Sequence, residues 1–209
     1  MTSSFRPNKK GAVLVFGESV NDSQSILHLL IGANVSLAGR VRSVRRPVSL
    51  TRDAKPNTVR DWVNELRRTV RAFEAVNGRV AAVVVHRDAD GHDPNGAVAA
   101  DLARQLTALD GHPVVPVQAI EAWWFLFPDA VEAVRPRTWK GKLPRQPRNV
   151  ELINRPKKAL QQATQGRGTP EYAESDSPII AAYIREKSLI PLCPCRSYDR
   201  MVTLATSIA

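Results

Sequence analysis

Continuous apolar runs recur along the first part of the chain and predict buried strands. Residues 12–16 and 80–85 contain no polar side chain, which is typical of strands buried on both faces. A run at residues 114–117 predicts a further strand. At residues 40–50, valines alternate loosely with arginines around a proline, a pattern that indicates an edge strand.

Apolar residues spaced three or four apart predict helices between these strands. The strongest such pattern is a single apolar face that begins near Asn57, a helix cap, and ends at Gly78. The other expected caps and terminators are Asn21 or Asp22 with Gly32, and Asp93–Pro94 with Gly111. A short apolar helix is expected at residues 120–127. The alternation predicts an α/β fold, a parallel sheet flanked by helices with right-handed crossovers.

The pattern changes after residue 134. Residues 136–170 contain five prolines and little apolar periodicity, which is typical of loops and short helices. A final helix is expected at residues 178–187, and an apolar turn at residues 198–204 could fold back onto the α/β domain. We therefore expect a disordered lead-in at residues 1–10, an α/β domain at 11–135 and a basic, proline-rich extension at 136–209 that packs on that domain.

Positive charge is concentrated in this extension. The chain has a formal net charge of +10, and residues 136–170 carry nine Lys or Arg against a single acid, Glu151. Clustered cations bind phosphate backbones by releasing condensed counterions, so we expect a nucleic-acid partner, with DNA favoured over RNA. The candidate contacts are Lys140, Lys142, Arg145, Arg148, Lys157 and Lys158. The alternative is that these residues are ordinary solvated surface.

Other features of the sequence bear on membrane association, cellular location and the use of cysteine. No apolar run approaches the ~20 residues of a membrane-spanning helix, and the run after the N-terminal lysines is too short for the core of a signal peptide. We therefore expect a cytoplasmic protein without a membrane partner. Cys193 and Cys195 are too few for a disulfide framework and only half the ligands of a structural zinc site.

Acidic residues follow two of the predicted strands. Glu18 comes after residues 12–16, while Asp88 and Asp90 come after residues 80–85. In parallel α/β sheets functional residues gather at the carboxyl ends of the strands, and crowded carboxylates repel unless a hard cation lies among them. We therefore expect a Mg²⁺ site here, with Mn²⁺ as an alternative. Taken singly, each acid is explained more simply as a turn, cap or loop residue.

Two other kinds of ligand site are excluded. The segment from Asp88 resembles a calcium-binding EF-hand loop, but its sixth position is Asp93 instead of glycine and its twelfth is Ala99 instead of glutamate. The chain also lacks the glycine-rich motifs that bind nucleotide phosphates.

A glutamate after the first strand with a D-x-D after a later parallel strand resembles the motif pair of the Toprim domain, shared by topoisomerases, primases and overcoming-lysogenization-defect nucleases. The resemblance is closer to a bacterial Toprim-like family of the DUF4276 type and spans residues 11 to about 204. Its pieces are GESVND (17–22), VVVHRDADGHD (83–93), QAIEAWWFLFPDAV (118–131), NRPKK (154–158) and CRSYDRM (195–201).

The resemblance implies roles for individual residues. Glu18 would act as general base or metal ligand, Asp88 and Asp90 would be catalytic Mg²⁺ ligands, and Glu121 would be an additional ligand. Glu121 could equally be an acid favoured by the helix dipole. His86 and His92 flank the acids and are either incidental or able to protonate a leaving oxygen. Trp123 and Trp124 are expected in the core because their neighbours are apolar.

The expected function is that of a Mg²⁺-dependent nuclease, a phosphodiesterase that acts on nucleic acid. The resemblance also associates the chain with prokaryotic defence or mobile elements, and with a protein partner such as an ATPase. The alternative is a catalytically inactive module that binds nucleic acid or a partner. Strand transfer of the topoisomerase type is not expected, because it needs a nucleophilic tyrosine in a separate large domain and 209 residues leave no room for one. The oligomeric state stays open.

Overall fold

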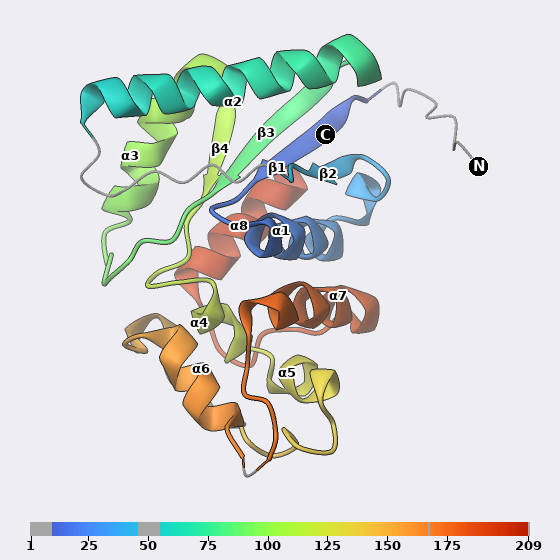
Figure 1. Cartoon of the computed structure of the whole chain (residues 1–209), viewed down its shortest axis with the longest axis vertical. Helices are drawn as coiled ribbons and strands as arrows, with labels where there is room; N and C mark the ends of the chain where they lie inside the picture. Colours follow the sequence, from blue (N-terminus) through green and yellow to red (C-terminus); the bar gives the residue numbers. More distant parts are fainter. Residues whose placement is uncertain (1–9, 46–54, 167, 209) are drawn as a thin grey trace.

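The centre of the protein is a parallel β-sheet (Figure 1). The computed structural model describes residues 10–45, 55–166 and 168–208. In these residues the strands are β1 (Ala12–Phe16), β2 (Val41–Ser43), β3 (Val80–His86) and β4 (Gly111–Val114). They lie in the order β2-β1-β3-β4, and all the pairings are parallel. The predicted α/β class with a parallel sheet flanked by helices is confirmed.

Helices cover both faces of the sheet (Figure 1). They are α1 (Val20–Ala33), α2 (Pro56–Asn77), α3 (Ala97–Leu106) and α8 (Arg196–Ser207). Leu14 and Phe16 of β1 belong to a hydrophobic cluster with α2 and α3, whereas Val13 and Val15 belong to a cluster with α1 and α8. Successive side chains of a strand point to opposite faces, so an unbroken apolar run is needed to bury both.

Further helices extend the core beyond the sheet. They are α4 (Glu121–Trp124), α5 (Pro128–Val134), α6 (Pro156–Thr164) and α7 (Ser177–Lys187), with short 3-10 turns at Val35–Leu37, Thr107–Leu109, Val150–Leu152 and Glu174–Asp176. α7 packs along α1 (Figure 1). α7 confirms the helix that was predicted at residues 178–187. The apolar turn that was expected at residues 198–204 lies within α8.

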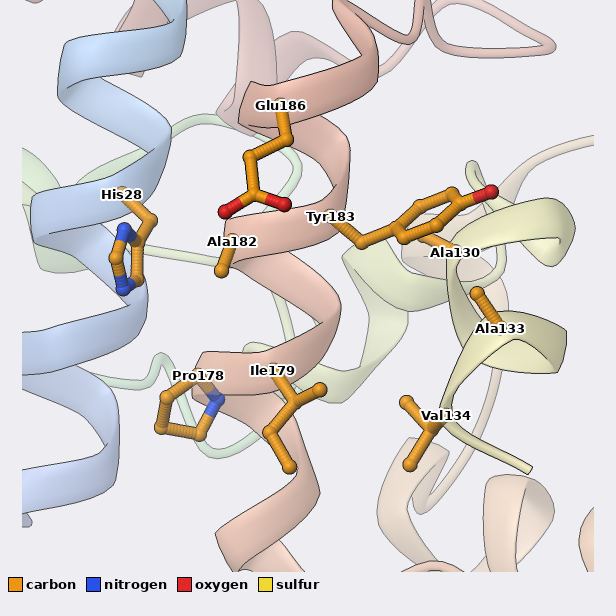
Figure 2. Close-up of a pocket in the computed structure, with 9 residues that line it drawn as sticks. All are labelled: His28, Ala130, Ala133, Val134, Pro178, Ile179, Ala182, Tyr183 and Glu186. Carbon is orange, nitrogen blue, oxygen red and sulfur yellow. The ribbon is translucent and has the colours of Figure 1, made fainter.

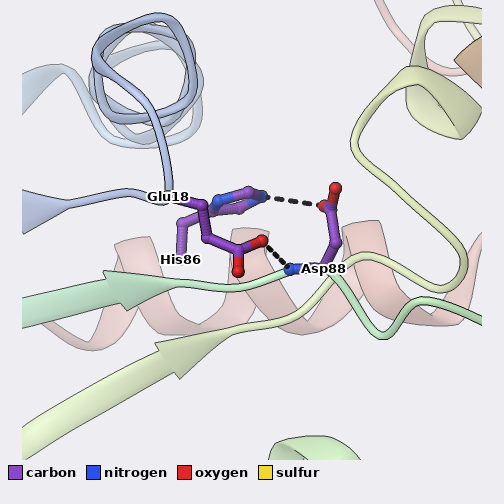
Figure 3. A group of neighbouring side chains, drawn as sticks. All are labelled: Glu18, His86 and Asp88. Carbon is purple, nitrogen blue, oxygen red and sulfur yellow. Dashed lines mark hydrogen bonds and ion pairs between the residues drawn. The ribbon is translucent and has the colours of Figure 1, made fainter. Parts of the chain in front are cut away.

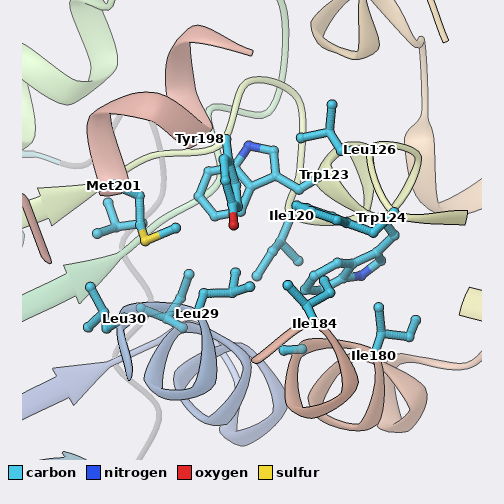
Figure 4. Packing of buried hydrophobic residues seen from close by; sticks show 14 of the residues in the cluster. Leu29, Leu30, Ile120, Trp123, Trp124, Leu126, Ile180, Ile184, Tyr198 and Met201 are labelled. Carbon is cyan, nitrogen blue, oxygen red and sulfur yellow. The ribbon is translucent and has the colours of Figure 1, made fainter. Parts of the chain in front are cut away.

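Trp123 and Trp124 of α4 are in the centre of the α1/α8 cluster (Figure 4). Both side chains are fully buried, and each indole Nε1–H donates to a serine hydroxyl. Trp123 bonds to Ser197 at 3.0 Å and Trp124 to Ser177 at 3.1 Å. Both tryptophans are therefore core residues, as predicted.

The fourth strand lies earlier than predicted. β4 spans Gly111–Val114 instead of residues 114–117 because Gly111, expected to end the preceding helix, already pairs with Val83 of β3. Residues 115–117 remain buried but leave the sheet. They run beside the loop that follows β3, so their apolar character reflects burial in the interior and not strand pairing.

The first two helices begin at other residues than predicted. α1 is capped by Ser19, whose hydroxyl accepts the Asp22 N–H while the Asp22 carboxylate accepts the Ser19 N–H. This reciprocal arrangement satisfies two backbone donors at once. α2 begins at Pro56, one residue before the expected cap Asn57, because the fixed φ of proline suits a first helical turn.

The next two helices are shorter than predicted. α3 begins at Ala97, yet the carboxylate of the expected cap, Asp93, still accepts the N–H groups of Ala97 and Val98 at 2.8 and 3.2 Å. The helix expected at residues 120–127 stops at Trp124, and Pro128 starts α5 after a break. The terminators differ as well, since α1 continues through Gly32, whereas Gly78 is the C-cap of α2 as predicted.

No helix in the described part of the chain is long and apolar enough to cross a membrane. Part of the predicted lead-in (residues 1–9) and of the predicted edge strand (residues 46–50) lies outside the described residues.

Candidate metal centre

Glu18 and Asp88 meet at the carboxyl edge of the sheet (Figure 3). Glu18 follows β1 and Asp88 follows β3, and these strands are neighbours. The Asp88 backbone N–H donates to Glu18 Oε2 at 3.1 Å, and the Ile120 N–H donates to Asp88 Oδ1 at 3.0 Å. Backbone donors therefore hold both carboxylates in place, and each keeps a second oxygen for a ligand.

His86 completes a compact group with these acids. It is the last residue of β3, its side chain is fully buried, and its Nε2 lies 3.3 Å from Asp88 Oδ1. Taking one ligand atom from each of Glu18, His86 and Asp88, all these atoms lie within 4.8 Å of one another. Within the part of the chain that the structure describes, neither imidazole nitrogen has a well-directed hydrogen-bond partner.

The burial and close approach of these groups shift their pKa values. Burial raises the pKa of Asp88, as do the charges of Asp22 and Asp90, although the contact with His86 opposes the change. Burial also raises the pKa of Glu18, and so does the charge of Asp88, whereas the Asp88 backbone N–H acts in the opposite direction. Burial disfavours the imidazolium of His86, but the neighbouring Asp88 outweighs this and raises its pKa to about 9. A divalent cation would place positive charge among these carboxylates and so favour their ionised forms.

Asp90 lies outside the compact group. It is exposed, with a backbone φ of 53°, so the extended D-x-D that would align Asp88 and Asp90 is not formed. The charge of Asp90 nevertheless contributes to the raised pKa values of Glu18 and Asp88. Asp90 is therefore near enough to act on the centre electrostatically without contributing to the compact ligand group.

Glu121 lies in the first turn of α4 and is also buried. Burial, with the charge of Asp88, raises its pKa to about 7. Its Oε1 accepts a hydrogen bond from the Tyr172 hydroxyl at 3.3 Å, and this hydroxyl also bonds to Ser177. Glu121 is therefore an outer acid, positioned by the core and able to exchange a proton near neutral pH.

The loop that carries Asp88 is fixed along its length by the chain that follows β4. The N–H groups of Arg87, Ala89 and Asp90 donate to the carbonyls of Val114, Pro116 and Gln118, at distances of 3.1, 3.1 and 3.0 Å. The first two of these bonds continue the spacing of the β3–β4 pairing, and the third departs from it by one residue. The centre is consequently preorganised by backbone interactions and does not depend on a free loop.

The six predicted nucleic-acid contacts are in different environments. Arg145 forms ion pairs with Asp129 and Glu132, the Lys142 ammonium donates to the Gln165 carbonyl at 3.2 Å, and Lys157 pairs with Glu174. The other three are Lys140, Arg148 and Lys158, and all six residues are exposed.

Lys157 is the cation of this set that is linked to the acidic centre. Its pKa is raised by the hydrogen bond to Glu174 and also by the charges of Glu121 and Asp22. In turn, Lys157 lowers the pKa of Glu121. The N-terminal turn of α6 therefore places a positive charge within electrostatic reach of Glu121.

Sequence patterns identified only part of this site. Asp22 was expected only as a helix cap, but its charge also acts on Asp88, His86 and Glu121. Tyr172 carried no recognisable signal, because its role depends on a contact across 51 residues. His86 was expected only to flank the acids, but its position at the end of an apolar run was a signal that could have assigned it to the group.

A separate groove of about 390 Å³ lies between α1, α5 and α7 (Figure 2). It is lined mainly by apolar side chains, with His28 from α1 and Glu186 from α7 as its ionisable groups beside the Tyr183 phenol. None of the acids at the sheet edge lines it, so this groove is distinct from the candidate metal centre.

The chain matches no protein-family model, and no curated protein or solved structure resembles it at a significant level. The likeness to Toprim domains therefore stays a prediction, and a function can be assigned only from the residues themselves.

Proposed function

We propose that the protein is a metal-dependent phosphodiesterase that cleaves nucleic acid at the carboxyl edge of its sheet. The observation that supports this most directly is the convergence of Glu18, His86 and Asp88, whose ligand atoms lie within 4.8 Å of one another. Glu18 and Asp88 would hold Mg²⁺ or Mn²⁺, with Asp90 and Glu121 as outer acids. The oxygen-rich donor set fits such ions.

A bound divalent cation supplies polarisation of a phosphate oxygen and a nucleophile at neutral pH. The other parts of the reaction belong to side chains of this protein. Glu121, with its pKa raised to about 7, can accept or return a proton under ordinary conditions. Glu18 is the alternative base, because burial raises its pKa as well.

Positive side chains of the basic segment would hold the polyanion. Lys157 is electrostatically coupled to Glu121, and Lys140, Lys142 and Lys158 are exposed on the same segment of the chain. Contacts of this kind bind phosphates without regard to sequence and add salt dependence to binding. We expect DNA as the preferred substrate.

A cleavage assay with metal replacement tests the proposal. Labelled plasmid, single-stranded DNA and RNA are incubated with the protein in Mg²⁺, in Mn²⁺ or in EDTA. We expect cleavage that requires metal and is lost in Asp88→Asn, whereas Asp101→Asn, which alters a partly exposed acid of α3, behaves as wild type. Binding without cleavage of any substrate in either metal would instead identify a catalytically inactive nucleic-acid-binding module.

A further inference from the structure

We infer that His86 is a direct ligand of the metal and that the centre therefore prefers a first-row transition ion over Mg²⁺. This inference rests on the proposed metal centre and specifies its donor set. Glu18 and Asp88 alone would form an all-oxygen site, but the imidazole of His86 lies among them. The distinction decides which ion occupies the centre.

The burial of His86 is the first reason. Its side chain has no exposed surface. Within the described residues its Nδ1 has no hydrogen-bond partner, and its Nε2 has only the 3.3 Å contact with Asp88, which does not meet hydrogen-bond geometry. Buried polar groups without a partner are costly and uncommon. The ring points into the group formed with the two carboxylates (Figure 3), so a cation among them would satisfy the nitrogen that faces Asp88.

The spacing of the ligand atoms is the second reason. Ligands bound at about 2.0–2.2 Å from a metal lie about 3 Å apart when adjacent and about 4 Å apart when opposite. The three ligand atoms lie within 4.8 Å of one another, so small side-chain movements would bring all of them to bonding distance. The backbone bond to Glu18 uses Oε2 and that to Asp88 uses Oδ1, which leaves Oε1 and Oδ2 for coordination.

The mixed donor set then determines the selectivity. Mg²⁺ requires near-octahedral oxygen ligands and loses its water reluctantly, whereas imidazole suits zinc, iron, cobalt and related ions. Manganese accepts carboxylate oxygens and also binds imidazole. A centre with two carboxylates and one imidazole therefore favours Mn²⁺, Co²⁺ or Zn²⁺ over Mg²⁺.

Metal titration by calorimetry tests the selectivity, with Mg²⁺, Mn²⁺ and Co²⁺ as probes. We expect wild type to bind Mn²⁺ and Co²⁺ at least about tenfold more tightly than Mg²⁺, a difference of about 1.4 kcal/mol. His86→Gln should lose this preference and keep its Mg²⁺ affinity within about threefold. The matched control is His112→Gln, a half-buried histidine of β4, which should bind as wild type does.

A second measurement requires no variant and covers the case in which His86→Gln does not fold. Pulsed electron paramagnetic resonance of the wild-type protein loaded with Mn²⁺ detects a coordinated imidazole by its ¹⁴N coupling. We expect that coupling to be present. Its absence, or equal Mn²⁺ affinity in His86→Gln and wild type, would overturn the inference while leaving the metal centre intact. Wild-type protein that binds none of the three ions would overturn the metal centre as well.

Discussion

The fold brings together acidic residues that are far apart in the sequence, whereas it engages basic residues that are close in the sequence in separate contacts. Glu18 and Asp88 are separated by 70 residues, yet a hydrogen bond of 3.1 Å joins them. The basic residues between 136 and 170 are close in sequence, but several are engaged in ion pairs or backbone contacts with residues 13 to 23 positions away. Strand ends in a parallel sheet converge by topology, whereas a high linear density of charge does not by itself make a binding surface.

The largest expected effect comes from changing Asp88. Asp88→Asn retains an oxygen for the Ile120 N–H but removes the charge, so metal affinity should fall by more than about 100-fold, beyond the loss typical for an outer-shell partner. Asp88→Ala also leaves the Ile120 N–H and the buried His86 without their contacts, and should lower the free energy of unfolding by about 1–3 kcal/mol. Calorimetric titration and urea unfolding measure the two effects. Equal metal affinity in Asp88→Asn and wild type would show that the cluster is structural.

Metal bound at the acidic edge of the sheet should stabilise the folded protein. At about 100 times its dissociation constant, a bound ion raises the free energy of unfolding by about 2.7 kcal/mol, because it binds only the folded state. For a chain of 209 residues, this corresponds to a rise in melting temperature of about 5–10 °C. Thermal melts with Mn²⁺ and with EDTA measure it, and Asp88→Asn should show no rise.

Substitutions in the basic segment should have a smaller effect, and the effect on nucleic-acid binding should grow with the number of positive charges removed. Replacing Lys140, Lys142, Lys157 and Lys158 with glutamine should lower the log–log salt slope of nucleic-acid binding by about one unit for each phosphate that is no longer neutralised. Fluorescence anisotropy at several salt concentrations measures the slope. An unchanged slope would mean that these lysines are solvated surface, and would remove the electrostatic support for a nucleic-acid substrate.

A substitution of Arg145 tests whether a positive charge of this segment stabilises the fold or binds nucleic acid. Arg145→Gln removes the ion pairs with Asp129 and with the buried Glu132. Since the guanidinium itself is half exposed, we expect the free energy of unfolding to fall by about 1 kcal/mol, with little change in the salt slope. Chemical denaturation and anisotropy on the same variant test both parts. A reduced salt slope with unchanged stability would assign Arg145 to binding instead.

The elements that the sequence predicted well are those fixed by burial on both faces. β1 is an unbroken apolar run, and so is β3 up to its last residue, His86. A central strand of an α/β fold needs such a run because both of its faces are buried. β4 was misplaced because Gly111, His112 and Pro113 pair with β3 although their side chains suggest a turn. Its pairing is imposed by the neighbouring strand, a tertiary effect that local pattern does not record.

Only part of the candidate site could be predicted from the sequence. Glu18 and Asp88 were identified because a rule for parallel sheets applies to residues at strand ends. The placing of Asp90 failed because a single φ of 53° turns its side chain away from an extended arrangement. The contribution of Tyr172 depends on its contact with Glu121, which joins segments that no local pattern connects.

The hydrogen bonds between the Asp88 loop and residues 114–118 bear on how the protein folds. The centre needs β1, β3 and the chain after β4 to be in place together, and contacts between such distant segments form slowly because loop closure precedes them. Metal uptake during refolding should consequently be a late event, after the helices have formed. The centre can therefore serve as a reporter of correct strand register, since a one-residue slip of a strand would turn its side chains to the opposite face of the sheet.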